Sequence, residues 1–200
     1  MENLQKLADA VVSRLFVELE ASGRHVHVTR EQAMVLFGHR LTPKRPLSQP
    51  GQFACREQLT VVGPKGQIAK VRVLGPERKA SQVEISLTDS FTLGIKAPVR
   101  MSGNIAGTPG CRLIGLAGEI ELSEGVIVAA RHLHLSASQA ALFGLKNGQI
   151  VRLRCEGERE TVFGNVIVRA GDGHDMEAHI DTDEANAIAM SGSTMVEVLK

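Results

Sequence analysis

The sequence carries Arg24-His25-Val26-His27-Val28-Thr29-Arg30-Glu31-Gln32-Ala33 near its start, and Arg131-His132-Leu133-His134-Leu135-Ser136-Ala137-Ser138-Gln139-Ala140 in its second half. Both stretches continue into Leu-Phe-Gly, at 36–38 and at 142–144. His132 lies 107 positions after His25. Similarity at a fixed offset indicates an internal repeat. The shared polar residues are not those that core packing requires, so the repeat indicates chemistry present in both halves.

A weaker second part of the repeat follows each copy. Val71-Arg72-Val73-Leu74 resembles Val166-Ile167-Val168-Arg169, and 83–89 resembles 178–184. Here Ile180 lies 95 positions after Ile85, so the second copy has twelve fewer residues between its motifs. Because a surface loop changes length at little cost, the repeat predicts two domains of one fold that differ in a loop.

Short runs of Val, Ile and Leu, separated by Gly, Pro and Asn, fill the chain after its first residues. Such runs are typical of short strands, and many short strands with regular turns favour small barrels. The predicted fold class is mainly β with short helices (α+β). We expect two similar small β-barrel domains, at 17–97 and 115–200, joined by a connector at 98–114.

Residues 1–16 differ from the rest of the chain. Leu4, Leu7, Val11 and Leu15 recur at three- and four-residue spacing, which predicts an amphipathic helix over 3–16. A helix of this length is marginal alone in water, so its apolar face needs a partner surface. The partner is either the chain's own barrel or another protein.

The composition excludes several function classes. The chain has 200 residues, 43% of them hydrophobic, and a formal net charge of +1, so no bulk attraction to nucleic acid or membranes is expected. It has no Trp and no Tyr, which argues against base stacking. No stretch approaches the ~20 apolar residues of a membrane span, and the N-terminus does not resemble a secretory signal. We expect a cytoplasmic protein.

The cysteines are few and scattered. Cys55, Cys111 and Cys155 are odd in number and form no C-x-x-C motif, which argues against a disulfide framework and against a cysteine-rich zinc site. None has a neighbouring sequence partner that marks a nucleophile. We expect inert thiols in a reducing compartment.

The duplicated H-x-H motif predicts metal binding. Residues two apart on a strand point to the same side, so His25 can converge with His27, and His132 with His134, on one ion each. Imidazole suits zinc and other first-row metals. The weaker part of the repeat offers a third ligand at equivalent positions, Glu84 in one copy and His179 in the other.

The two expected sites therefore comprise His25, His27 and Glu84, and His132, His134 and His179. Three protein ligands leave positions open, which is typical of a catalytic metal, and we expect the two ions to serve one active site.

Other polar residues near these motifs have two interpretations. Thr29 and Ser136 resemble helix N-caps, with Gln32 and Gln139 completing capping boxes. Asp181, Asp183 and Glu184 either orient ligand imidazoles or, as we favour, cap a helix over 184–190. Arg78 lies just before the Glu84 strand, where a guanidinium suits phosphate or carboxylate.

The chain resembles the PduL-type phosphotransacylases (phosphate propanoyltransferases) from about residue 17 onward. The motifs that carry the resemblance are Arg24–His27, Leu47–Phe53, Val71–Pro76, Ser81–Ser86, Gly125–His134 and Glu177–Asn186. The resemblance implies exchange of a propanoyl or acetyl group between coenzyme A and phosphate, on two β-barrels with a dizinc site. It assigns one zinc to His25, His27 and Glu84, the other to His132, His134 and His179, and phosphate to Arg78. Gly23 and Leu87 depart from the family pattern, which usually has Asn and Arg there.

The resemblance also implies partners. Family members in bacterial microcompartments often carry an N-terminal amphipathic helix that directs encapsulation, so residues 3–16 are expected to dock on a shell protein, with self-association as the alternative. Two rival functions stay open. One is a cupin-like metal enzyme, because His25-x-His27-x-x-x-Glu31 imitates that spacing; the other is a noncatalytic, metal-stabilised microcompartment-associated protein. The sequence determines neither the acyl chain, the direction of reaction, the metal in vivo, the oligomeric state nor the coenzyme A contacts.

Overall fold

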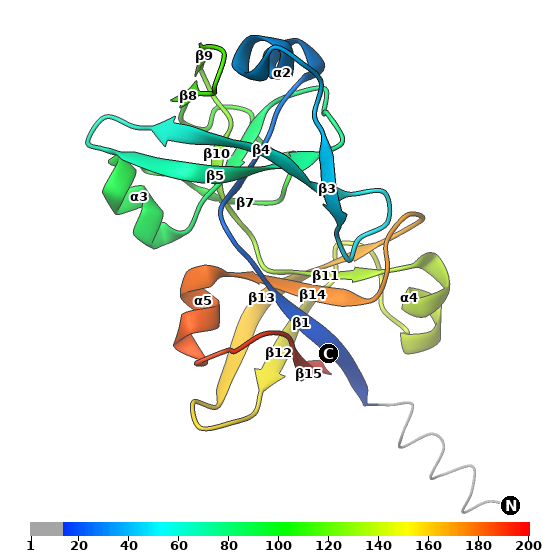
Figure 1. The fold of residues 1–200 in the computed structure, drawn as a ribbon. Helices are drawn as coiled ribbons and strands as arrows, with labels where there is room; N and C mark the ends of the chain where they lie inside the picture. Colours follow the sequence, from blue (N-terminus) through cyan, green and yellow to red (C-terminus); the bar gives the residue numbers. More distant parts are fainter. Residues whose placement is uncertain (1–13) are drawn as a thin grey trace, which may run out of the picture. The chain divides into compact units, whose positions relative to one another are not determined.

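A computed structural model describes residues 14–200 and is drawn in Figure 1. The described residues form short helices and many strands, which confirms the predicted mainly β class. The helices are α2 (Arg30–Phe37), α3 (Leu87–Leu93), α4 (Ala137–Phe143) and α5 (Thr182–Ala187). No helix among these residues is both long and apolar enough to span a membrane.

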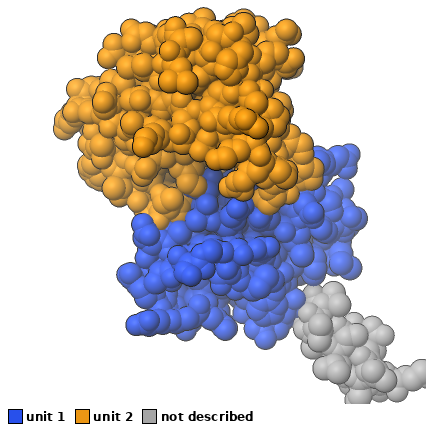
Figure 2. Space-filling view, in the orientation of Figure 1, with its two compact units in different colours: residues 1–22, 131–180, 184–200 blue, residues 23–130, 181–183 orange. Residues whose placement is uncertain are grey.

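The chain divides into two compact units, coloured separately in Figure 2. Unit 1 comprises the described residues up to Ser22 together with 131–180 and 184–200, and unit 2 comprises 23–130 and 181–183. This division differs from the expected one at 17–97 and 115–200. The first strand pairs with the C-terminal half, and the strands between 111 and 129 complete the sheet of the N-terminal half. These boundaries are set by pairing between strands that are distant in the sequence, which local sequence patterns do not predict.

Unit 1 is a closed barrel of six strands with the order β1-β14-β11-β13-β12-β15. Its strands are β1 (Leu15–Ser22), β11 (His132–Leu135), β12 (Ile150–Cys155), β13 (Thr161–Ala170), β14 (Glu177–Asp181) and β15 (Thr194–Leu199). Side chains alternate along them between an apolar core and the outside, as Leu15, Val17 and Leu19 do on β1. Closure leaves the barrel without a free sheet edge.

Unit 2 is built on one curled sheet with the order β7-β10-β6-β2-β5-β4-β8-β9, and β3 pairs with β4. The strands are β2 (His25–His27), β3 (Pro43–Pro46), β4 (Phe53–Val62), β5 (Gln67–Gly75), β6 (Gln82–Glu84), β7 (Val99–Arg100), β8 (Cys111–Ile114), β9 (Glu119–Leu122) and β10 (Val126–Ala129). The short β2 and β6 are buried along their whole length, and both bear candidate ligands.

The repeat is present in the strand register as well as in the sequence. β2 lies between β5 and β6, and β11 lies between β13 and β14. His25 stands opposite Glu84 on an antiparallel neighbour, and His132 stands opposite His179 in the same way. Lys70 and Asn165, 95 positions apart, both have a left-handed backbone, with φ of 59° and 55°. The two copies therefore share local irregularities as well as strand order.

The predicted helix over 3–16 lies largely outside the described residues. Its last two positions, Leu15 and Phe16, are wrong as helix, because they begin β1 and pair with β15. Leu15 is buried in the barrel core, so it cannot anchor a docking helix. The alternation of Leu15, Val17 and Leu19 has period two, and barrel pairing takes precedence over the weaker helical period here.

Both predicted capping boxes are confirmed. The Thr29 side chain accepts from the backbone N–H of Gln32, whose own side chain accepts from the N–H of Thr29. Ser136 and Gln139 repeat this exchange at the start of α4. Each cap follows a histidine strand by one or two residues, so it fixes the direction in which the chain leaves that strand.

Candidate metal centres

His25, His27 and Glu84 come together in unit 2, as the sequence predicts. Their candidate ligand atoms all lie within 4.8 Å of one another, and all three residues are buried. The histidines come from β2 and the glutamate from the adjacent β6. His25 Nε2 lies 3.5 Å from a carboxylate oxygen of Glu84. We call this group the Glu84 site.

Backbone carbonyls orient both histidines of the Glu84 site. His25 Nδ1 lies 2.8 Å from the carbonyl oxygen of Gly23, and His27 Nδ1 lies 3.2 Å from that of Leu74. A carbonyl only accepts, so each Nδ1 carries the proton when the ring is neutral. The Nε2 lone pair of each ring is then available to an ion, which is the arrangement found around metal-binding histidines.

The charges of the Glu84 site are strongly coupled. Burial lowers the pKa of His27 to about 3, helped by the neighbouring His25 and Arg78. Burial also opposes the charged form of His25, but the Glu84 carboxylate outweighs it and leaves the pKa of His25 raised. For Glu84, burial is outweighed by its attraction to His25 and His27, and its pKa is held far below the ordinary value. The site therefore offers a carboxylate and a neutral imidazole at neutral pH.

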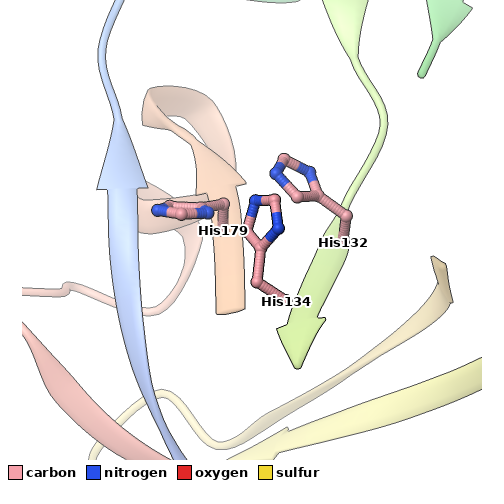
Figure 3. A group of neighbouring side chains, drawn as sticks. All are labelled: His132, His134 and His179. Atoms are coloured by element: carbon pink, nitrogen blue, oxygen red, sulfur yellow. The ribbon is translucent and has the colours of Figure 1, made fainter. Parts of the chain in front are cut away.

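Unit 1 brings together His132, His134 and His179, again as the sequence predicts (Figure 3). Their ring centroids lie 4.7 to 5.3 Å apart, and their candidate ligand atoms lie within 4.8 Å of one another. His134 is buried, whereas the other two are partly exposed. Burial, together with the neighbouring histidines and Arg169, lowers the pKa of His134 to about 2. We call this group the His179 site.

Two carboxylates contact the Nε2 atom of His179. Its Nε2 lies 3.1 Å from Glu177 and 3.4 Å from Glu20. In Figure 3 one ring nitrogen of His179 is directed toward β1, the strand that carries Glu20, and the other toward His134. Burial disfavours a charge on this ring, but the bonds to Glu177 and Glu20 outweigh it and raise the pKa of His179 to about 9.

Both sites fit a bound metal ion. Nδ1 of His134 and Nδ1 of His179 are buried without a hydrogen-bond partner among the described residues. A buried, unpaired nitrogen costs free energy, and an ion bound by it removes that cost. Two imidazoles with a carboxylate, and three imidazoles, are donor sets that zinc accepts. That the six residues are ligands nevertheless stays a prediction.

Arg78 is placed next to the Glu84 site. Its backbone N–H donates to Val28, directly after the H-x-H strand, and its guanidinium donates to the Ser102 hydroxyl at 3.2 Å. Its positive charge disfavours protonation of both His25 and His27, although the pKa of His25 is raised overall by Glu84. A guanidinium here can meet an anion that approaches the site.

Sequence reasoning missed three residues that touch the third candidate ligands. Glu177 and Glu20 contact His179, while the side-chain amide of Gln82 donates to Glu84 at 2.5 Å. For two of them the internal repeat contained a signal. Gln82 and Glu177 are 95 positions apart, which is the offset of the repeat, and each precedes a third candidate ligand by two residues.

The acidic cluster after His179 makes other contacts. Glu184 bonds Arg131 at 2.5 Å, and Asp183 accepts from the backbone N–H of Thr88. The helix that follows is α5 at Thr182–Ala187, earlier than the predicted 184–190.

The cupin-like alternative would use Glu31 as the metal ligand beside His25 and His27. Glu31 is exposed in the first turn of α2, whereas Glu84 completes the His25/His27 group.

The cysteines have the character of core residues. Cys55, Cys111 and Cys155 are all buried and free. Burial raises the pKa of Cys55 and of Cys111 to about 12, with nearby carboxylates adding to the effect, and burial also raises the pKa of Cys155. A thiol must ionise to attack, so these groups are poor nucleophiles at neutral pH.

Comparison with known proteins gives a consistent result. A family model described as phosphate propanoyltransferase matches residues 18–191. A phosphate propanoyltransferase of Clostridioides difficile is 45% identical over 207 residues, covering 100% of this chain and 99% of its own. Those of Salmonella typhimurium and Thermotoga maritima are 50% and 47% identical, covering 86% and 90% of this chain and 82% and 87% of their own.

Proposed function

The chain belongs to the phosphate propanoyltransferase family, and we propose that it moves a short acyl group, propanoyl or acetyl, between coenzyme A and phosphate by using one zinc ion at each of its two histidine sites. It is an acyltransferase, as its relatives are. The observation that carries the zinc proposal is the repetition of one ligand arrangement, in one strand register, in two units of a member of this family.

The reaction forms one bond and breaks another at the thioester carbonyl carbon. A phosphate oxygen attacks this carbon, and the bond from carbon to sulfur breaks, so that an acyl phosphate and the coenzyme A thiolate leave. Zinc would supply Lewis acidity, which stabilises negative charge on phosphate and on sulfur. His25, His27 and Glu84 would hold one ion, and His132, His134 and His179 the other.

In this proposal the residues around the Glu84 site would supply charge and orientation. The Arg78 guanidinium, placed by Ser102 and by its own backbone bond to Val28, would bind phosphate and keep one oxygen aimed at the carbonyl. Because bound reactants are already positioned, the reaction step avoids the loss of translational and rotational entropy that free reactants would suffer. Direct transfer needs no protein nucleophile, which agrees with three buried thiols of raised pKa.

The decisive experiment combines metal analysis with an assay of coenzyme A release. Purified protein should contain two zinc ions per chain, and it should release coenzyme A from propanoyl-CoA or acetyl-CoA only when phosphate is present. Chelation should abolish the release and added zinc should restore it. Folded protein that binds no transition metal would refute the dizinc proposal, and zinc-loaded protein without phosphate-dependent release would refute the reaction.

A localisation proposal rests on the family resemblance alone. We propose that the segment before β1 docks on a microcompartment shell protein. Because Leu15 belongs to the barrel core, a truncation that tests this should remove 1–13 only. The truncated chain should keep its zinc and its turnover but lose co-localisation with shell proteins. Unchanged co-localisation would contradict the proposal.

A further inference from the structure

The third ligand of each site has a partner on its own strand, two residues earlier. Gln82 precedes Glu84 on β6, and Glu177 precedes His179 on β14. Both partners are buried and occupy the same register, Gln82 opposite His27 and Glu177 opposite His134. The repeat therefore places one polar side chain at an equivalent point of each site.

The two partners are chemically opposite, and each matches its ligand. The Glu84 carboxylate only accepts hydrogen bonds, and the Gln82 amide nitrogen donates to it at 2.5 Å. His179 presents Nε2 to carboxylates, which only accept, and Glu177 lies 3.1 Å away. An acceptor ligand thus has a donor partner, and a donor ligand has an acceptor partner.

Each partner leaves a defined atom of the ligand for the ion. Gln82 bonds Oε1 of Glu84, whereas His25 Nε2 lies near the other oxygen, Oε2. Glu177 and Glu20 contact Nε2 of His179, whereas Nδ1 of His179 is buried without a hydrogen-bond partner among the described residues. A proton on Nε2 fixes the tautomer whose Nδ1 lone pair can bind a metal.

Gln82 is itself held rigidly. Its amide nitrogen also donates to the Ser102 hydroxyl at 2.8 Å, and its carbonyl oxygen accepts from the backbone N–H of Gly103 at 2.7 Å. These bonds fix which end of the amide faces Glu84, because the oxygen is occupied by an N–H donor. The Ser102 hydroxyl also accepts a hydrogen bond from the Arg78 guanidinium. A continuous chain of hydrogen bonds therefore connects Arg78, the candidate phosphate-binding residue, to Glu84.

We propose that Gln82 and Glu177 are equivalent positioning residues, which orient Glu84 and His179 for their metal ions, with Glu20 assisting at His179. This inference deepens the proposed function and rests on its two metal sites. In this role both residues would act through a metal ligand, without contact to the reacting atoms. Outer partners of this kind typically change metal affinity by roughly 10- to 100-fold.

A crossed experiment tests the proposal by zinc affinity instead of activity. His132→Ala leaves the Glu84 site as the one to be measured, and His25→Ala leaves the His179 site. In the first background, Gln82→Met should weaken zinc binding by roughly 10- to 100-fold and Glu177→Met should leave it unchanged. In the second background the two effects should exchange. Affinity is read by competition with a chromophoric chelator.

Graded substitutions separate positioning from general stability. Glu177→Gln keeps an oxygen that accepts from Nε2, so it should weaken zinc binding less than Glu177→Met does. The matched control is Glu197→Gln, which alters another buried carboxylate of unit 1, bonded to Arg14, and should leave zinc affinity unchanged. If Glu177→Met does not fold, Glu177→Gln alone must still show the weakening in the second background.

Three results would overturn the inference. Zinc affinity that is equal for all variants would show that the partners do not position the ligands. Effects that do not follow the crossed pattern would show a loss of general stability. Complete loss of the ion in Glu177→Gln, as in His179→Ala, would make Glu177 a direct ligand on the Nε2 side. Wild-type protein that binds no zinc would instead refute the proposed function, so the two failures are distinguishable.

Discussion

The two copies of the repeat build the same site by different means. In the Glu84 site, both H-x-H histidines donate from Nδ1 to backbone carbonyls and all three candidate ligands are buried. In the His179 site, His134 Nδ1 has no hydrogen-bond partner among the described residues, and the carboxylates of Glu177 and Glu20 contact His179. In the Glu84 site, backbone carbonyls therefore orient the two histidines of the H-x-H motif, whereas in the His179 site two carboxylates contact the third histidine.

This difference accompanies a change in the third candidate ligand, Glu84 in one site and His179 in the other. A carboxylate at 84 brings a negative charge into a buried site, where it stabilises positive charge on its neighbours. An imidazole at 179 brings none, and Glu177 and Glu20 supply negative charge from outside the ligand set. The two units keep the candidate ligands at equivalent positions, while the negative charge lies on the third candidate ligand in unit 2 and on its partners in unit 1. Equal geometry therefore does not imply equal electrostatics.

The largest expected effect comes from removing one ligand of either copy. His27→Ala and His134→Ala should each cost one zinc per chain and lower phosphate-dependent coenzyme A release by more than about 100-fold, beyond the usual effect of an outer partner. Zinc content by elemental analysis and the release assay measure this. Full activity in either variant would show that only one copy is catalytic.

A ligand exchange serves as the matched control for this comparison. Glu84→His gives unit 2 the same three imidazoles as unit 1, so it should retain zinc where Glu84→Ala loses it. If Glu84→His also loses zinc, the negative charge at 84 is required in its own right. The two sites would then differ in kind.

A smaller effect is expected at Arg78, next to the Glu84 site in unit 2. Arg78→Ala should raise the KM for phosphate by roughly 10- to 150-fold, the loss expected for a charge-assisted contact, and should change the KM for acyl-CoA far less. Steady-state kinetics with each substrate varied in turn measures this. Equal changes in the two values would contradict a phosphate-specific role.

The helix caps provide a still smaller and nearly equal effect in the two copies. Thr29→Ala and Ser136→Ala should each lower the free energy of unfolding of metal-free protein by about 1 kcal/mol, because each removes one capping acceptor. Chemical denaturation measures this. A clear inequality would show that the copies depend differently on the segment after the histidine strand.

The smallest expected effect comes from the cysteines of either unit. Cys55→Ala in unit 2 and Cys155→Ala in unit 1 should keep most activity, since neither thiol ionises readily. In folded protein at pH 8, the thiols should react slowly with a disulfide reagent and quickly after denaturation. Isolation of an acyl-enzyme on any cysteine would overturn direct transfer.

The sequence by itself determined the fold class, the repeat and the six candidate ligands. Alternation on a strand brings His25 to the side of His27, and this is a local property of the backbone that needs no tertiary information. The offset of 95 then pointed to Glu84 and His179, because duplicated domains keep the same strand register. The capping boxes were equally visible, since a cap involves residues only three apart.

Only the tertiary structure decided which strands complete each unit and which side chains surround the ligands. β1 joins the C-terminal barrel through β15, and residues near 15 pair with residues near 198, a distance that no local pattern spans. Glu20 reaches His179 through the same closure. Non-local strand pairing depends on the combined burial of many strands, whereas periodicity and capping act within a few residues. For this physical reason the sequence predicted the periodicity and the caps, but strand pairing required the tertiary structure.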